Sequence, residues 1–134
     1  MFDDDNVKTF IRDILGCSCP DEVFEEVSIQ PVSYEIGKVN INFQIKIGGR
    51  LLIFVCRTDD AHAVSESLKE IFQKGISIRN NHRFNRFRFV VATSNEDLAR
   101  EMIIPVFQNL DDIDENTHLH IIHSKELPNL FHRL

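Results

Sequence analysis

The sequence has little cysteine, no tryptophan and no long apolar run, and two of these shortages exclude whole classes of protein. It holds only 3 cysteines in 134 residues. An odd, small number of cysteines argues against a framework of structural disulfides and for a reducing compartment. No apolar stretch approaches the length that a membrane-spanning helix needs. We therefore expect a soluble chain that folds around an apolar core.

Basic charge is also in short supply. The net charge is −6, so general attraction to nucleic acid or to an anionic membrane is not expected, and binding to either would need a local patch. The chain starts Met1-Phe2-Asp3-Asp4-Asp5, which is acidic where a secretory leader is basic. These features predict a cytoplasmic protein that does not bind membranes.

Recognised enzyme motifs are missing as well. The sequence contains no phosphate-binding loop, no dinucleotide-binding glycine pattern, no serine-hydrolase elbow and no zinc-protease motif. It gives no positive sign of catalysis and no cofactor is predicted from it. What it does have is an ordinary apolar content of 43% with 27% charged residues, which suits one globular domain spanning residues 1–134.

The stretch Leu51–Arg57 is the expected centre of the fold. Its first six residues are all apolar, with Gly48-Gly49 before them and Thr58-Asp59-Asp60 after them. A short unbroken apolar run between turn residues predicts a strand that is covered on both faces. Such a strand needs neighbouring strands and a helical layer above and below.

Two further strands are predicted just before this one. Residues 39–47 alternate apolar and polar side chains, which predicts a half-exposed strand, and Gly48-Gly49 favours a hairpin into the next strand. Residues 27–36 change apolar parity at Pro31, which predicts an edge position or a bulge. The apolar side chains expected on one face of the 39–47 strand are Val39, Ile41, Phe43, Ile45 and Ile47.

Helical spacing of apolar residues alternates with the strands. We expect Gly75 to end one helix. A second helix should start at Ser94, turn Leu98, Met102 and Ile103 toward the core, and be kinked or ended by Pro105. The segment 76–86 is expected to be irregular, as is an acidic loop over 109–117. The remaining predicted helices cover residues 4–15, 20–26, 61–74 and 127–134, and the remaining strands cover 88–93 and 118–123.

Together these elements give the order α-(α)-β-β-β-α-β-α-β. Strands joined by short turns pair antiparallel, whereas strands joined through helices run parallel with right-handed crossovers. The sequence therefore predicts an α/β fold with a single mixed sheet, in which an antiparallel three-strand meander is followed by parallel strands, flanked by helices.

Parts of this order match a known architecture. The predicted elements follow the order helix, three-strand meander, helix and strand. The segments that look most like the matching parts are Tyr34-Glu35-Ile36-Gly37, the two strands around Gly48-Gly49, and Phe89-Val90-Val91-Ala92-Thr93-Ser94. Over residues 4–93 the chain resembles the core of the PD-(D/E)XK nuclease-like superfamily, which includes restriction endonucleases. The resemblance implies a nuclease-like fold.

The catalytic pattern of that superfamily does not carry over. Where its second strand supplies a metal-binding aspartate, this chain has Asn40 and Asn42, and where its third strand supplies an acidic residue followed two positions later by lysine, this chain has Val55-Cys56-Arg57. Without carboxylates a magnesium ion has no anionic ligands. The resemblance therefore implies a non-catalytic relative.

A basic and aromatic segment over residues 79–89 is one candidate site. Four arginines and three phenylalanines fall within these eleven residues. Arginine binds phosphate or carboxylate in a bidentate manner, and aromatic rings stack on bases. The segment could bind nucleic acid, another anion or an acidic protein surface, including the 111–115 loop of a second copy in a homodimer. The candidate residues are Arg79, His82, Arg83, Arg86 and Arg88.

A simpler interpretation of the same segment is also open. If residues 86–89 form a strand, Phe87 and Phe89 lie in the core while Arg86 and Arg88 are solvated on the other side. This interpretation accounts well for 86–89 and less well for Arg79 to Arg83.

The pair Cys17-x-Cys19 is a second candidate. Two thiolates two residues apart can share zinc or another thiophilic metal, and a strained disulfide between them would suit a redox switch. A full zinc site needs four ligands, and the sequence has no second pair of cysteines. The alternative is that both are small residues packed where two helices meet.

The histidines His118 and His120 are a third candidate. On a strand they point the same way and could present two imidazoles to one metal. The alternative is an exposed strand face with Leu119 and Ile121 inward.

Taken together, the sequence predicts a non-catalytic binding module, and its alternative is a thiol-based metal-binding or redox protein that uses Cys17 and Cys19.

Overall fold

One five-stranded sheet forms the body of the molecule. The computed structural model describes residues 9–14, 16, 27–82, 84–111 and 113–128. The strands lie in the order β1-β2-β3-β4-β5, antiparallel from β1 to β3 and parallel from β3 to β5. This confirms the predicted mixed α/β sheet. The strands are β1 (Val27–Ile36), β2 (Val39–Ile47), β3 (Leu51–Arg57), β4 (Arg86–Thr93) and β5 (Thr117–His123).

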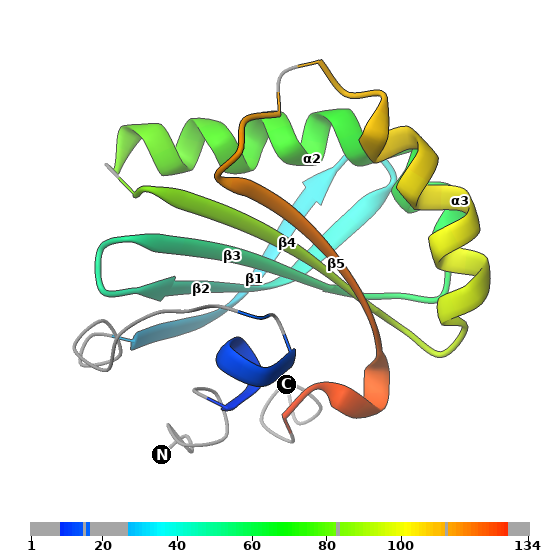
Figure 1. The fold of residues 1–134 in the computed structure, drawn as a ribbon, viewed down its shortest axis with the longest axis horizontal. Helices are drawn as coiled ribbons and strands as arrows, with labels where there is room; N and C mark the ends of the chain where they lie inside the picture. The colour runs from blue at the N-terminus through cyan, green and yellow to red at the C-terminus, as the bar shows by residue number, and fades with distance from the viewer. Residues whose placement is uncertain (1–8, 15, 17–26, 83, 112, 129–134) are drawn as a thin grey trace.

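Two long helices cover one face of the sheet. Helix α2 (Ala61–Asn81) joins β3 to β4, and helix α3 (Glu96–Gln108) joins β4 to β5. Both lie above the sheet in Figure 1, whereas the short helix η1 (Phe10–Ile14) lies below it and η3 (Ser124–Glu126) follows β5. The predicted helix over 20–26, half of that over 4–15 and most of that over 127–134 fall outside the described residues.

The central strand β3 is buried on both faces, as its apolar run predicts. Its first six residues are all at most 1% exposed. Alternate side chains enter two separate core clusters, one beneath α2 and α3 and one on the opposite face with Phe10 and Ile11 of η1. Because both faces of β3 are covered, every position from Leu51 to Cys56 has to be apolar.

Strand β2 differs from its simple alternation pattern. Val39 and Ile41 pack in the cluster beneath the helices, whereas Phe43, Ile45 and Ile47 pack in the cluster on the other face. The expectation that all five share one face is therefore wrong. Pairing between β2 and β3 stops at Phe43, opposite Val55. The residues of β2 before Phe43 therefore do not have to follow the orientation of β3.

The turns of the meander follow the glycines and the proline. Both Gly48 and Gly49 have positive φ angles, of 57° and 63°, and the amide of Arg50 donates to the carbonyl of Ile47 at 3.0 Å. Glycine adopts this backbone readily. In β1 the pairing register shifts between Pro31 and Tyr34, so β1 is an edge strand with a bulge, as predicted.

Helix α2 is about two turns longer than the sequence suggests. It runs through Gly75 to Asn81 rather than ending at 74. Gly75 is buried against β4, and a Cβ atom there would lie only 2.1 Å from the Phe87 ring. The glycine is therefore a close-packing position and not a helix stop, and the segment predicted to be irregular is helical as far as residue 81.

Helix α3 also departs from expectation at two points. Its N-cap is Asn95 rather than Ser94, and the Asn95 side chain accepts from the amide of Leu98. The backbone amide of Ser94 donates to the carboxylate of Asp59 at 2.7 Å. Leu98 is 42% exposed rather than inward. The helix also continues past Pro105, which is exposed, so water can reach the carbonyl of Glu101 that loses its partner.

None of the helices in the described part of the chain is long and apolar enough to cross a membrane.

Candidate anion-binding surface

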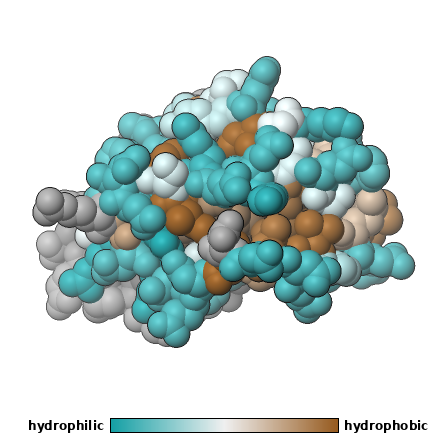
Figure 2. All heavy atoms as spheres, turned by 90° about the horizontal axis from the view of Figure 1, so that it is seen from above, coloured by the Kyte–Doolittle hydropathy of each residue, from teal (hydrophilic) through white to brown (hydrophobic). Residues whose placement is uncertain are grey.

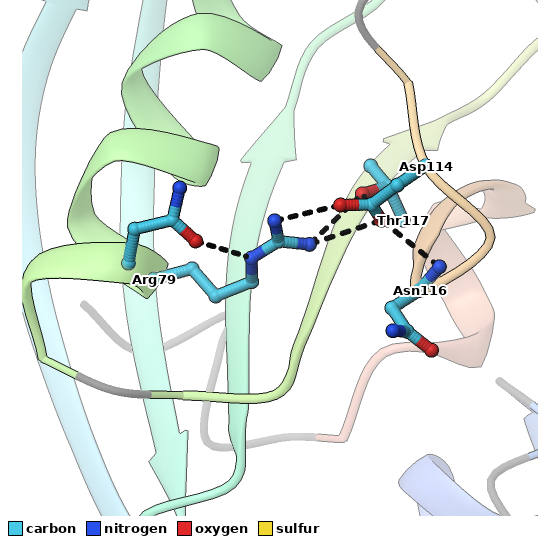
Figure 3. A network of polar contacts seen from close by, with 5 residues as sticks. Arg79, Asp114, Asn116 and Thr117 are labelled. Atoms are coloured by element: carbon cyan, nitrogen blue, oxygen red, sulfur yellow. Dashed lines mark hydrogen bonds and ion pairs between the residues drawn. The ribbon is translucent and has the colours of Figure 1, made fainter.

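Arg79, the first residue of the predicted basic segment, is buried and forms hydrogen bonds within the fold. It lies in the last turn of α2 and is only 7% exposed. Its Nη2 donates to Oδ2 of Asp114 at 2.7 Å, and its Nη1 donates to Oδ1 of Asp114 at 3.1 Å and to the Thr117 hydroxyl at 3.3 Å (Figure 3). We call this arrangement the Arg79–Asp114 clip, and it joins α2 to the loop before β5.

The clip also accounts for part of the acidic loop. The hydrogen bond from Arg79 is the main reason that the pKa of Asp114 falls to about 2. The amide of Asn116 and the hydroxyl of Thr117 donate to the same carboxylate, at 2.9 and 2.8 Å. An acidic residue that the sequence offers to a second copy of the chain thus pairs with an arginine of its own chain.

The parallel pairing of β4 and β5 brings together two candidate sites that the sequence predicts separately. Arg88 lies opposite His118 in the register, and Val90 lies opposite His120. The Nη1 atom of Arg88 is 2.8 Å from Nε2 of His120, and the rings of His118 and His120 are 6.5 Å apart. We call Arg86, Arg88, His118 and His120 the Arg/His cluster.

The four side chains differ in their accessibility. Arg86 is exposed and His118 is partly exposed, whereas Arg88 is 6% exposed. The expectation that Arg86 is solvated is confirmed, and the same expectation for Arg88 is wrong. Arg88 shares its face of β4 with Val90 and Ala92, which pack in the cluster around Phe10, so it lies on a covered part of the sheet.

Burial and mutual repulsion set the charge of the cluster. Burial lowers the pKa of Arg88, and the charge of Arg86 lowers it further. The pKa of His118 is lowered by burial and then by both arginines. The pKa of His120 falls to about 4, chiefly through burial and then through Arg88. At neutral pH His120 is therefore uncharged and accepts a hydrogen bond from Arg88 through Nε2.

Two of the three phenylalanines of the segment do not share a surface with its arginines. Phe87 and Phe89 are fully buried beneath the helices, as the simpler interpretation of the segment predicts. Phe84 packs partly against the same core cluster and lines a hollow of about 290 Å³ with Lys46 and Gly48-Gly49. Because neighbouring residues of a strand point to opposite faces, the rings and the cations of β4 are separated by the sheet.

The other members of the segment lie at the end of α2. His82 is exposed at the C-cap, where its ring lies 6.2 Å from that of Phe84 and its Nδ1 lies 3.1 Å from the carbonyl of Ile78. Arg83 lies outside the described residues.

Metal sites find no support in the part of the chain that the structure describes. No group of three or more histidine, cysteine, aspartate or glutamate side chains there could hold a metal ion. Cys17 and Cys19 lie outside that part, so their proposed chemistry stays a prediction. Cys56 is buried, donates to the carbonyl of Asn40 at 3.5 Å, and has a pKa that burial raises to about 12.

The positions that matter for the nuclease-like resemblance carry amides in local hydrogen bonds. Asn42 Oδ1 accepts from the amide of Arg57 at 2.7 Å, and Asn40 Oδ1 accepts from the hydroxyl of Ser33 at 3.1 Å. These amides bind neighbouring strands to one another. The geometry therefore gives them a role in the sheet.

Searches for similar proteins were negative: no protein-family model, no curated protein and no solved structure matches this chain.

Proposed function

We propose that this chain is a non-catalytic binding module that takes an acidic segment of a partner protein at the Arg/His cluster. The observation that carries the proposal is the pairing of Arg88 with His118 and His120 across β4 and β5, next to the exposed Arg86. Besides burial, Arg86 disfavours the charge on Arg88, both arginines disfavour positive charge on His118, and Arg88 and His118 disfavour it on His120. A carboxylate placed against Arg86 and His118 would relieve this repulsion.

An acidic protein segment fits this surface better than nucleic acid does. Recognition of single-stranded nucleic acid combines cations with aromatic platforms on which bases stack. Here the rings of Phe87 and Phe89 are buried on the opposite side of β4 from the arginines. The overall charge of −6 further opposes a polyanion as long as nucleic acid.

Binding of a fluorescein-labelled hexaglutamate peptide tests the proposal. We expect binding at an ionic strength of about 0.01 M, where the Debye length is roughly 30 Å, and a loss of about tenfold or more in affinity for Arg86→Glu. The matched control is Lys74→Glu, which makes the same change of charge at an exposed position of α2. Equal affinity of the parent chain and Arg86→Glu would contradict the proposal.

Dependence on pH provides a second, independent readout. Bound carboxylate should raise the lowered pKa of His118, so the complex takes up a proton and binding should strengthen as the pH falls toward and below 6.5. The variant His118→Gln should lose this dependence. A labelled single-stranded oligonucleotide is tested in parallel, and preferential binding of the oligonucleotide would replace the acidic peptide with nucleic acid as the partner.

A further inference from the structure

A hollow of about 370 Å³ lies between α2 and residues 109–111 and 113, which follow α3. Figure 2 views the molecule from above and shows several apolar patches between hydrophilic side chains. The hollow lies on the opposite face of the sheet from the Arg/His cluster, and nothing in the proposed function uses it. Its lining residues are Lys69, Phe72, Gln73, Ile76, Ser77, Asn109, Leu110, Asp111 and Ile113.

The apolar part of this hollow has a rigid base. Phe72 contacts Phe87 and Phe89 edge-to-face, with ring centroids 5.6 and 5.9 Å apart, and packs against Phe107 at 5.2 Å. Ile76, Leu110 and Ile113 complete the apolar lining. Aromatic packing of this kind leaves the Phe72 ring little room to move and fill the space.

The Arg79–Asp114 clip fixes the opposite wall. Asp114 directly follows Ile113, and its two hydrogen bonds to Arg79 hold this part of the loop against α2. The space is therefore formed in the absence of a ligand, and binding would not have to pay for ordering of the wall.

The rim of the hollow carries one charge of each sign. Lys69 and Asp111 are both exposed and both line the hollow, and within the described residues neither forms an ion pair with another side chain. Gln73, Ser77 and Asn109 add neutral hydrogen-bonding groups. An apolar base below a cation and an anion is complementary to a small zwitterion with an apolar side chain.

We infer that this hollow is a binding site for a free α-amino acid with a large apolar side chain, of the leucine or phenylalanine type. The side chain lies against the partly exposed Ile76, Leu110 and Ile113, above the buried Phe72 ring, the carboxylate faces Lys69 and the ammonium group faces Asp111. The size is adequate, since a cavity of about 150 Å³ already accommodates benzene.

Calorimetric titration with L-phenylalanine, L-leucine and glycine tests the side-chain requirement. We expect the first two to bind with a Kd of about 1 mM or tighter and glycine not to bind at about 10 mM. Failure of both apolar amino acids to bind at that concentration would overturn the inference, and so would equal binding of glycine.

Two analogues and three variants test the charged rim. Phenethylamine lacks the carboxylate and 3-phenylpropionate lacks the ammonium group, so each should bind at least about fivefold more weakly than phenylalanine. Lys69→Ala should weaken phenylalanine binding but not phenethylamine binding, and Asp111→Asn should weaken phenylalanine binding but not 3-phenylpropionate binding. Lys74→Ala, an exposed position of α2 outside the lining, is the control. Analogues that bind as tightly as phenylalanine would overturn the zwitterion assignment.

Discussion

At the scale of single residues, the protonation state of His120 determines whether it can form a hydrogen bond with Arg88. The Nε2 atom of His120 accepts from Arg88 only while the imidazole is neutral. Protonation would place a second cation 2.8 Å from a buried guanidinium. The two strands β4 and β5 therefore share a contact that depends on pH.

This contact predicts a loss of stability in mild acid. The pKa of His120 is about 4 in the folded chain and 6.5 in the unfolded chain. Since the unfolded state binds the proton first, the stabilisation is complete above pH 6.5 and is lost as the pH falls through 4. The loss should reach about 3 kcal/mol, measured by urea unfolding across this range.

The variant His120→Gln separates this proton from other effects of acid. Glutamine can still accept from Arg88 but does not titrate, so its stability should change less between pH 6.5 and 4. His82→Gln changes an exposed histidine and should follow the parent chain. Parallel curves for the parent and His120→Gln would show that the imidazole does not control the acid response.

At the scale of elements, the Arg79–Asp114 clip links the end of α2 to the start of β5. Arg79→Met removes the guanidinium and leaves the apolar stem, and it should destabilise the chain by about 1–3 kcal/mol, as loss of hydrogen bonds between charged groups does. Hydrogen exchange should also accelerate in residues 109–117, because the loop loses its attachment. Arg50→Met changes an exposed arginine just before β3 and should leave exchange in this loop unchanged.

The clip should also fail at low pH. The pKa of Asp114 is about 2 against an ordinary value of 3.8, so its contribution is present above pH 3.8 and disappears as the pH falls through 2. Asp114→Asn should therefore resemble the acid state of the parent at neutral pH, with faster exchange in the same loop. Unchanged exchange in both variants would mean that other contacts hold the loop.

Elements were predictable where a local pattern determines them. The strands β2 and β3, their glycine turn and the bulge at Pro31 follow from residues that are close in sequence. The end of α2 does not follow from nearby residues. A glycine such as Gly75 commonly ends a helix, but here it lies inside α2 and faces the Phe87 ring. The split of β2 between two clusters has the same origin, since the alternation pattern contains no information about which layer covers each half.

The candidate site was predictable only as separate parts. The arginines over 79–88 and the pair His118 and His120 are visible in the sequence, and two parallel neighbouring strands could be expected to bring them near one another. The register that sets Arg88 beside His118 cannot be read from either strand alone, and the burial of Arg79 involves a partner 35 positions away. The hollow beside Phe72 has no signature in the sequence.

At the scale of the whole molecule, both edges of the sheet are protected. On β1 the bulge at Pro31 interrupts the ladder. On β5 the amide of Thr117 donates to Asp114, the carbonyl of Ile121 accepts from Arg100 at 2.8 Å, and the amide of His123 donates to Glu126. Edge strands treated in this way are poor templates for pairing with another chain.

Substitution of Pro31 should remove the protection from β1. Pro31→Thr restores a backbone donor at an exposed edge position, so we expect stability within about 0.5 kcal/mol of the parent but greater self-association with rising concentration. Sedimentation velocity over a range of concentrations measures the association. Ser28→Thr makes a conservative change at another exposed position of the same strand and is the control. Identical profiles for all three chains would contradict the expectation.

The burial of Cys56 gives the chain an internal reference for chemical labelling. A thiol that is 1% exposed and whose pKa is about 12 reacts with alkylating reagents at neutral pH only when the sheet opens. Thiols that react quickly in the native protein can therefore come only from Cys17 and Cys19, and the delayed third thiol reports unfolding in the same experiment. A single labelling time course thus measures the reactivity of the Cys17-x-Cys19 pair and the integrity of the fold together.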